Sequence, residues 1–292
     1  MQVADLRPLS LGELLDRCFT LYRRHFLLFL GISGVPYIAV LVLNLARIFF
    51  LPGLSVPRMP GHTATAPPDL TTISIYSSLS LLILVTTWVV AVISQGATVV
   101  AVSELYLGRT ITIADSFRRG LSSFFRLVGV GIITGIVVFV GFIFLIVPGV
   151  YLFCRLLVGV PVTVMEGHMP RQSLERSYSL TQDNAGRAFL ILLLYFVLVY
   201  AGVIFFSVPF YVLMATSQHN PEIAVVWLAL ASVGQIISTV LVSPILHISS
   251  SLFYFDLRIR KEGLDLQLMM RDNTSSDTMM GPPVVQQPSL FT

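Results

Sequence analysis

The sequence predicts an all-α membrane protein in which six transmembrane helices form three parallel hairpin repeats, each preceded by a cytoplasmic amphipathic helix. Three observations lead to this fold class: the composition, the length of the apolar runs and the placement of the arginines. Of the 292 residues, 55% are hydrophobic and only 11% are charged, and the mean hydropathy is +0.85. Because a soluble domain carries about 25% charged residues, this composition indicates a membrane protein.

Six apolar runs approach or exceed the roughly 20 residues that a helix needs to cross a bilayer. They cover residues 26–51, 76–106, 124–147, 150–165, 188–215 and 223–255. The fourth run is the shortest, and we expect a turn at Val147-Pro148-Gly149 to join it to the third. The segment before the first run is polar and has no apolar centre, so it does not have the pattern of a cleavable signal peptide.

The remaining segments complete the predicted organisation. Residues 1–271 form a six-span membrane domain, which includes an N-terminal amphipathic helix at 1–25 and an external, Pro-rich loop at 52–72. Residues 272–292 are rich in Ser, Thr, Pro and Gln, a composition typical of a disordered segment. We therefore expect them to form a disordered cytoplasmic tail.

The basic residues predict the orientation. Apart from Arg47, Arg58 and Arg155, all of the 18 basic residues flank the spans on one side. Because positive charge is retained on the cytoplasmic side, we expect both termini of a multi-pass membrane protein to be cytoplasmic.

A repeat supports the hairpin arrangement. When the sequence is shifted by 61 positions, two hairpins align without a gap. The aligned positions include Arg126 with Arg187, Gly141 with Gly202, and Val147-Pro148 with Val208-Pro209. The first hairpin matches only in part. Since every unit begins on the same side, the repeats are predicted to be parallel, around an axis along the membrane normal, with an approximate threefold arrangement.

Each unit is expected to begin with a short amphipathic helix. Ser10 with Glu13, and Thr112 with Asp115, have the spacing of a capping box. We expect such helices to lie in the headgroup plane with the apolar face down. The apolar stripe of the first consists of Leu11, Leu15, Cys18, Tyr22 and Phe26. The cytoplasmic residues predicted to contact headgroups are Arg17, Arg118, Arg119 and Arg176.

Each even-numbered span ends in a carboxylate. These helix-end residues are Glu104, Glu166 and Asp256, and a basic residue follows each of them five positions later.

Arg155 lies within the fourth apolar run, about 16 Å above Glu166 at the rise of an α-helix. An arginine near the bilayer centre costs at least about 2.5–3.5 kcal/mol and normally faces protein or water. Gln95 and His247 lie at a similar predicted depth on other even spans, which suggests an intramembrane polar cluster of the three. The cluster has two readings: a ligand or ion site, or a structural arginine that bonds these residues or carbonyls freed near Pro161.

Motifs for other chemistry are absent from the sequence. There is no HExxH, CxxC, P-loop or GxGxxG pattern, and Cys18 and Cys154 suggest neither a disulfide framework nor a metal site. We therefore expect no catalytic residue, no metal, no cofactor and no nucleic-acid partner.

Four segments resemble a known family. They read PLSLGELLDRCFTLYRRHF, CRLLVGVPVTVMEG, QSLERSYSLTQDNAGR and FYFDLRIRKEG. Together they resemble the membrane domain of glycerophosphoryl diester phosphodiesterases, over about residues 8–268. The resemblance implies the fold and a bacterial inner-membrane location. In that family hydrolysis belongs to a separate soluble barrel, which we do not find in this sequence, so phosphodiesterase activity is not expected.

The leading hypothesis is therefore a non-enzymatic bacterial integral membrane protein that binds lipid, or a protein partner at its cytoplasmic face. The alternative is a small transporter or flippase-like subunit for an anionic or lipidic substrate.

Overall fold

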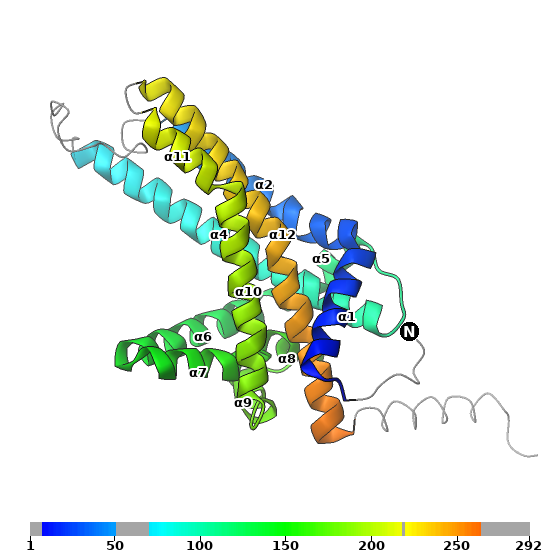
Figure 1. The fold of residues 1–292 in the computed structure, drawn as a ribbon. Coiled ribbons are helices and arrows are strands. Elements are labelled where there is room, and N and C mark those ends of the chain that lie inside the picture. The colour runs from blue at the N-terminus through cyan, green and yellow to red at the C-terminus, as the bar shows by residue number, and fades with distance from the viewer. Residues whose placement is uncertain (1–7, 51–69, 218–219, 264–292) are drawn as a thin grey trace, which may run out of the picture.

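The computed structural model describes residues 8–50, 70–217 and 220–263, and the regular structure in this part of the chain is entirely helical (Figure 1). The predicted tail at 272–292 and most of the predicted loop at 52–72 lie outside the described residues. The helices are α1 (Leu11–Arg24), α2 (Phe26–Phe50), α4 (Leu70–Tyr106), α5 (Ile113–Leu121), α6 (Phe124–Phe144), α7 (Ile146–Leu156), α8 (Gly159–Glu166), α9 (Pro170–Leu180), α10 (Ala185–Phe206), α11 (Val208–Thr216) and α12 (Pro221–Glu262).

The six predicted apolar helices are confirmed. Six helical segments are long and apolar enough to cross a membrane, and the fourth and fifth of these are α7 with α8 and α10 with α11. Their surfaces carry many exposed apolar side chains, among them Phe125 at 86% and Phe50 at 83% relative exposure. Exposed apolar surface on this scale is compatible with contact to lipid.

The longest helix is the centre of the fold. α12 has 42 residues and contacts α1, α2, α4, α10 and α11. α6 and α7 form an antiparallel hairpin that diverges from α4 and α11 in Figure 1. The base of this hairpin is held by α9, which contacts α6, α7 and α8.

Three prolines explain where helices end. A proline inside a helix removes one backbone hydrogen bond, and its ring clashes with the carbonyl four residues earlier. α6 ends at Phe144, four residues before Pro148. α7 ends at Leu156 and α10 at Phe206, each within one residue of the position four before Pro161 and Pro209. These breaks divide the fourth and fifth apolar segments in two.

Two predicted boundaries were wrong. The turn predicted at Val147-Pro148-Gly149 lies at Leu145, whose extended backbone (φ −170°, ψ 156°) separates α6 from α7. Pro148 is instead in the first turn of α7, where the missing N–H leaves no helical bond unmade. In addition, α4 begins at Leu70, so residues 70–72 are helical and not part of the external loop.

The repeat is visible in the helix boundaries but not in the chain path. A shift of 61 residues carries the start of α6 at Phe124 onto the start of α10 at Ala185, and brings the start of α7 to within one residue of the start of α11. However, α7 folds back along α6, whereas α11 leads on from α10 and packs against α12 (Figure 1).

The sequence predicted that the apolar stripe of α1 lies on the membrane surface, but in the structure α1 packs against α12. It runs antiparallel along α12, as two contacts show. The backbone N–H of Leu9 donates to the Asp256 carboxylate (2.7 Å), and the Tyr22 hydroxyl donates to the carbonyl of Leu241 (2.9 Å). Between them, Cys18 is fully buried against α12, and its thiol lies 3.6 Å from the carbonyl of Ile245. The predicted capping box at Ser10 and Glu13 is present. Of the stripe, Cys18 is therefore in the protein core and Leu11, Leu15 and Tyr22 pack against it, whereas Phe26 stays exposed.

The break between α10 and α11 depends on a close approach to α12. A Cβ atom added to Gly234 would overlap the carbonyl oxygen of Phe206, which is backbone and cannot rotate away. We predict that Gly234→Ala lowers the melting temperature in detergent, by the equivalent of about 1–3 kcal/mol for an overpacked site. Gly135→Ala is the matched control, since a Cβ there meets nothing within 4 Å. Equal melting temperatures for the two variants would contradict the close approach.

Candidate functional site

The three helix-end carboxylates each hold a segment from another part of the chain. At the end of α4, Glu104 pairs with Arg119 of α5 (2.7 Å) and, at 3.6 Å, with Arg109. Of the basic residues five positions after a helix-end carboxylate, Arg109 is the one that contacts it. Arg171 pairs with Glu175, and Lys261 donates to the backbone carbonyls of Ser179, in the last turn of α9, and Gln182, just after it.

Glu166, at the end of α8, lies in a larger network. It accepts a hydrogen bond from the Tyr254 hydroxyl (2.7 Å) and contacts Arg176 of α9 (3.3 Å) and His168 (3.0 Å). Arg176 also pairs with Glu262, near the end of α12. The carboxylate therefore links α8, α9 and α12.

Asp256 is the most deeply buried of the three, with a side-chain exposure of 0%. One carboxylate oxygen contacts Arg187 of α10 (2.7 Å) and Arg260 (3.0 Å), and the other accepts the N–H of Leu9 (2.7 Å). Both arginines also donate to the carbonyl of Leu9. We name this group the Asp256 clasp: Leu9, Arg187, Asp256 and Arg260.

The three carboxylates follow one rule of contact. The carboxylate at the end of α4 contacts α5, the one at the end of α8 contacts α9, and the one near the end of α12 contacts Leu9, two residues before α1. The carboxylates of α4 and α8 thus contact the short helix that follows next in the chain, and that of α12 contacts the segment before the first helix.

The sequence pointed to the carboxylates but not to their partners. Arg126 and Arg187 occupy equivalent places in the 61-residue repeat, at the starts of α6 and α10. In the structure Arg126 donates to the carbonyl of Gly167 (2.6 Å), at the end of its own hairpin, just as Arg187 reaches Asp256. Their alignment in the repeat was the signal that could have identified this role.

The predicted headgroup contacts differ in their availability. Arg119 and Arg176 are engaged with Glu104 and Glu166, and Arg17 also has an interaction partner. Arg118 is exposed on α5 and makes no ion pair within the described residues. Of the four, Arg118 is therefore the arginine that remains free to contact a headgroup or a partner.

Arg155 is buried, with 6% relative exposure, and is held by α9 and by its own helix. Its guanidinium donates to the carbonyl of Tyr178 (2.8 Å) and to the hydroxyl of Tyr151 (3.2 Å), and it lies 3.8 Å from the centroid of the Tyr178 ring. Its own carbonyl accepts hydrogen bonds from the hydroxyls of Ser177 in α9 and Thr181, the C-cap of that helix. Its Nε has no hydrogen-bond partner.

The predicted cluster of Arg155, Gln95 and His247 is not joined by hydrogen bonds. Both other residues are partly buried, on α4 and α12, and neither is among the partners of Arg155. The break that Pro161 imposes after Leu156 explains the difference, because α9 packs beside it and presents the carbonyl and ring of Tyr178 to the guanidinium.

An apolar groove of about 430 Å³ adjoins Arg155, between α7 and α10. The groove is lined by Ile146, Val147, Val150, Tyr151, Cys154, Ala185, Gly186 and Phe189. Tyr151 belongs to both features, since it lines the groove and its hydroxyl accepts from Arg155. No carboxylate in the described part of the chain forms an ion pair with Arg155, whose guanidinium does not line the groove itself but is connected to it through the Tyr151 hydroxyl.

Metal-binding clusters are not found among residues 8–50, 70–217 and 220–263, where no group of three or more His, Cys, Asp or Glu side chains could hold an ion. Cys18 and Cys154 are both free and buried.

No family model matches this chain, and no curated protein or solved structure matches it either. The resemblance to the membrane domain of glycerophosphoryl diester phosphodiesterases therefore stays an expectation from the sequence. The fold itself defines a class: an all-helical chain with six helices long and apolar enough to span a membrane, which is compatible with an integral membrane protein.

The Asp256 clasp gives a prediction for stability. Removing one partner of a fully buried ion pair costs about 3–5 kcal/mol, but the side chains of Arg187 and Arg260 are 21% and 37% exposed, so solvent screening reduces the cost here to about 1–3 kcal/mol. We predict that Asp256→Asn destabilises the protein by this amount and releases α1 from α12. Burial raises the pKa of the Cys18 thiol to about 12, so the docked thiol is protonated and covered. In a Cys154→Ser background, maleimide labelling of Cys18 is expected to be slow in the parent and fast in Asp256→Asn.

Glu175→Gln is the matched control. Its pair with Arg171 is at the surface, with side-chain exposures of 64% and 88%, and exposed pairs of this kind contribute little. Slow labelling of Cys18 in Asp256→Asn would show that the clasp does not hold α1.

Proposed function

We propose that this chain is a non-enzymatic, multi-pass protein of a bacterial inner membrane, and that it binds an anionic phospholipid at Arg155 and the groove between α7 and α10. One observation carries the proposal: Arg155 is a buried charge with no carboxylate partner, and it lies beside an apolar groove.

A guanidinium stays protonated in proteins, so burial cannot remove this charge by titration. Its neutral partners, a carbonyl, a hydroxyl and an aromatic ring, offset part of the desolvation penalty but leave the net charge in place. A lipid phosphate supplies a full negative charge and strong acceptors, and Nε is a donor still unused.

The groove has the apolar lining that an acyl chain of a lipid requires. Seven of its eight lining residues are aliphatic, aromatic, glycine or a buried cysteine, and the eighth, Tyr151, turns its hydroxyl toward Arg155. An acyl chain in the groove would therefore be anchored at one end by the phosphate. Burial of apolar surface and a single charged contact together favour a lipid over a soluble anion.

The orientation in this proposal follows the arginine distribution, with both termini and the helix-end carboxylates on the cytoplasmic side. Three parallel hairpin repeats, each opened by an amphipathic helix, are supported by the contact rule that links the end of each hairpin to the start of the next. Arg118 on this face is the residue best placed to meet a protein partner, since it is exposed and outside the ion pairs.

A transporter or flippase-like subunit is the second candidate. The observation that favours it is the pair of broken helices, at Leu157–Val158 and at Ser207, where the Ser207 hydroxyl is buried without a partner. Transporters bind substrates at such breaks. A reconstituted vesicle in which labelled lipid changes leaflet at the rate of an empty vesicle would remove this candidate.

The lipid site is tested by native mass spectrometry of the protein released from lipid discs that contain equal amounts of neutral and anionic phospholipid. We predict that wild type retains anionic lipid above its bulk fraction, and that Arg155→Leu reduces this retention by about tenfold, as expected for the loss of one charged hydrogen-bonding group. Arg155→Lys keeps the charge but not the fork of donors, so an intermediate result is expected.

Arg24→Leu is the control, because it removes a positive charge of the same kind from an exposed position that does not line the groove. Bulk-like lipid in both wild type and Arg155→Leu, together with a lower melting temperature for the variant, would make Arg155 structural and contradict the proposal.

A further inference from the structure

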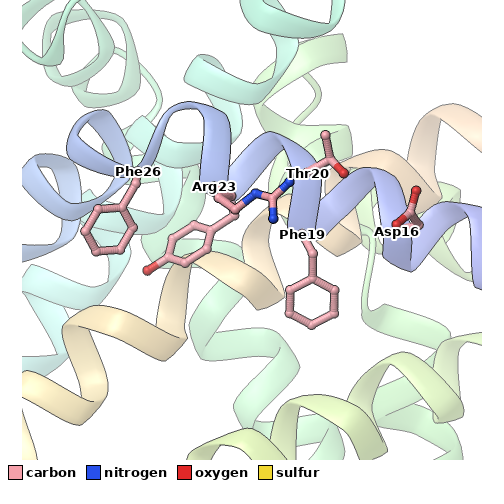
Figure 2. A pocket seen from close by; sticks show the side chains of 6 residues that line it. Asp16, Phe19, Thr20, Arg23 and Phe26 are labelled. Carbon is pink, nitrogen blue, oxygen red and sulfur yellow. The ribbon is translucent and has the colours of Figure 1, made fainter.

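A second hollow lies along α1, at its junction with α2. It has a volume of about 380 Å³ and is lined by Asp16, Phe19, Thr20, Tyr22, Arg23 and Phe26. Figure 2 shows Phe19 and Phe26 projecting to the same side of the helix, with Arg23 between them in this view. Tyr22 lines the side of the hollow nearest α12, since its hydroxyl donates to the carbonyl of Leu241.

Two opposite charges face this hollow without pairing. Asp16 and Arg23 are both exposed, and neither forms an ion pair with any described residue. They are seven residues apart, which is about 10 Å along a helix, so they share a face but are too far apart to neutralise each other directly. In Figure 2 the guanidinium of Arg23 extends toward Thr20, on the side of Asp16.

Two large aromatic side chains accompany the charges. Phe19 and Phe26 are 39% and 37% exposed. Phe26 is the first residue of α2, the first apolar helix, so this end of the hollow lies where the membrane span begins. Trp and Tyr are the aromatic side chains enriched at that boundary, and Tyr22 also lines this hollow.

We propose that this hollow binds the headgroup of a zwitterionic phospholipid, with its phosphate at Arg23 and its ammonium group at Asp16. The order of groups along α1 matches the order within such a lipid. Phe26, at the start of the span, is nearest the acyl chains, Arg23 comes next and Asp16 is farthest away. In the lipid the phosphate likewise lies between the acyl chains and the ammonium group. The face of Phe19 adds a cation–π surface for the ammonium group.

The charges also separate this site from the Arg155 groove. Arg155 has no carboxylate beside it and selects for a net negative ligand, whereas Asp16 opposes a second negative charge and selects for a ligand with a positive end. The two sites lie on different helices, so each is expected to respond only to its own variants.

The test compares two phospholipids with the same acyl chains, phosphatidylethanolamine and phosphatidylglycerol, in discs that contain equal amounts of both. The protein is released into detergent and the retained lipids are counted by native mass spectrometry. Asp16→Asn is expected to lower the ratio of retained phosphatidylethanolamine to phosphatidylglycerol by about two- to fivefold, the range that an exposed ion pair supports. Arg23→Gln is expected to lower the retention of phosphatidylethanolamine without requiring any change in the fold, since the side chain is exposed.

Arg24→Gln is the matched control, because Arg24 is the exposed neighbour of Arg23 but does not line the hollow. An unchanged lipid ratio in Asp16→Asn overturns the proposal, as does an equal effect of Arg24→Gln and Arg23→Gln. Repeating the comparison in an Arg155→Leu background keeps the two sites distinct: the effect of Asp16→Asn is expected to persist even where the anionic-lipid site of Arg155 has been removed.

Discussion

The carboxylate of Asp256 joins parts of the chain that are far apart in the sequence, and the docking of α1 depends on it. It neutralises Arg187 and Arg260 and accepts the backbone N–H of Leu9, so that α10, α12 and the segment before α1 meet at one buried point. The two arginines in turn donate to the Leu9 carbonyl, so that both backbone polar groups of this residue are hydrogen-bonded. Without this neutralised centre, two positive charges would face each other beneath α1.

The clasp is one of several ion pairs that separate the arginines of the described residues into a paired and an unpaired group. Near the ends of α4, α8 and α12, arginines are paired with carboxylates and hold helices together. Arg155, Arg118 and Arg23 are different, because none of them has a carboxylate partner in the described part of the chain. The paired arginines explain the fold, and the unpaired ones are where a ligand with negative charge has something to neutralise.

The sequence predicted the six apolar helices because a run of about 20 apolar residues has few alternatives to crossing a membrane. The Ser10–Glu13 capping box was likewise predictable, since it depends on residues three positions apart. The turn at Leu145 was misplaced because Pro148 is compatible both with a turn and with the first turn of a helix, and only packing decides between them.

The surroundings of Arg155 could not be derived from helix geometry alone. A straight helix would have placed it deep in the span, level with Gln95 and His247, but the break before Pro161 brings α9 beside it. The partner is the carbonyl of Tyr178, a backbone atom that no residue pattern identifies. Similarly, α1 carries the amphipathic stripe of a surface helix, and the pattern does not distinguish a lipid surface from the side of α12 as the apolar partner.

The docking of α1 has a consequence for how the protein is made. Leu9 and Asp256 are 247 residues apart, and a ribosome adds about 5–20 residues per second. The N-terminal helix is therefore synthesised tens of seconds before the helix that will cover it. Throughout that interval the surface of α12 against which its stripe of Leu11, Leu15, Cys18 and Tyr22 packs has not yet been made. An amphipathic helix is suited to the time between the synthesis of α1 and that of α12, since its polar face can contact water while its apolar face contacts the membrane. The surface location suggested by its sequence thus describes α1 during biosynthesis, and the contact with α12 describes it afterwards.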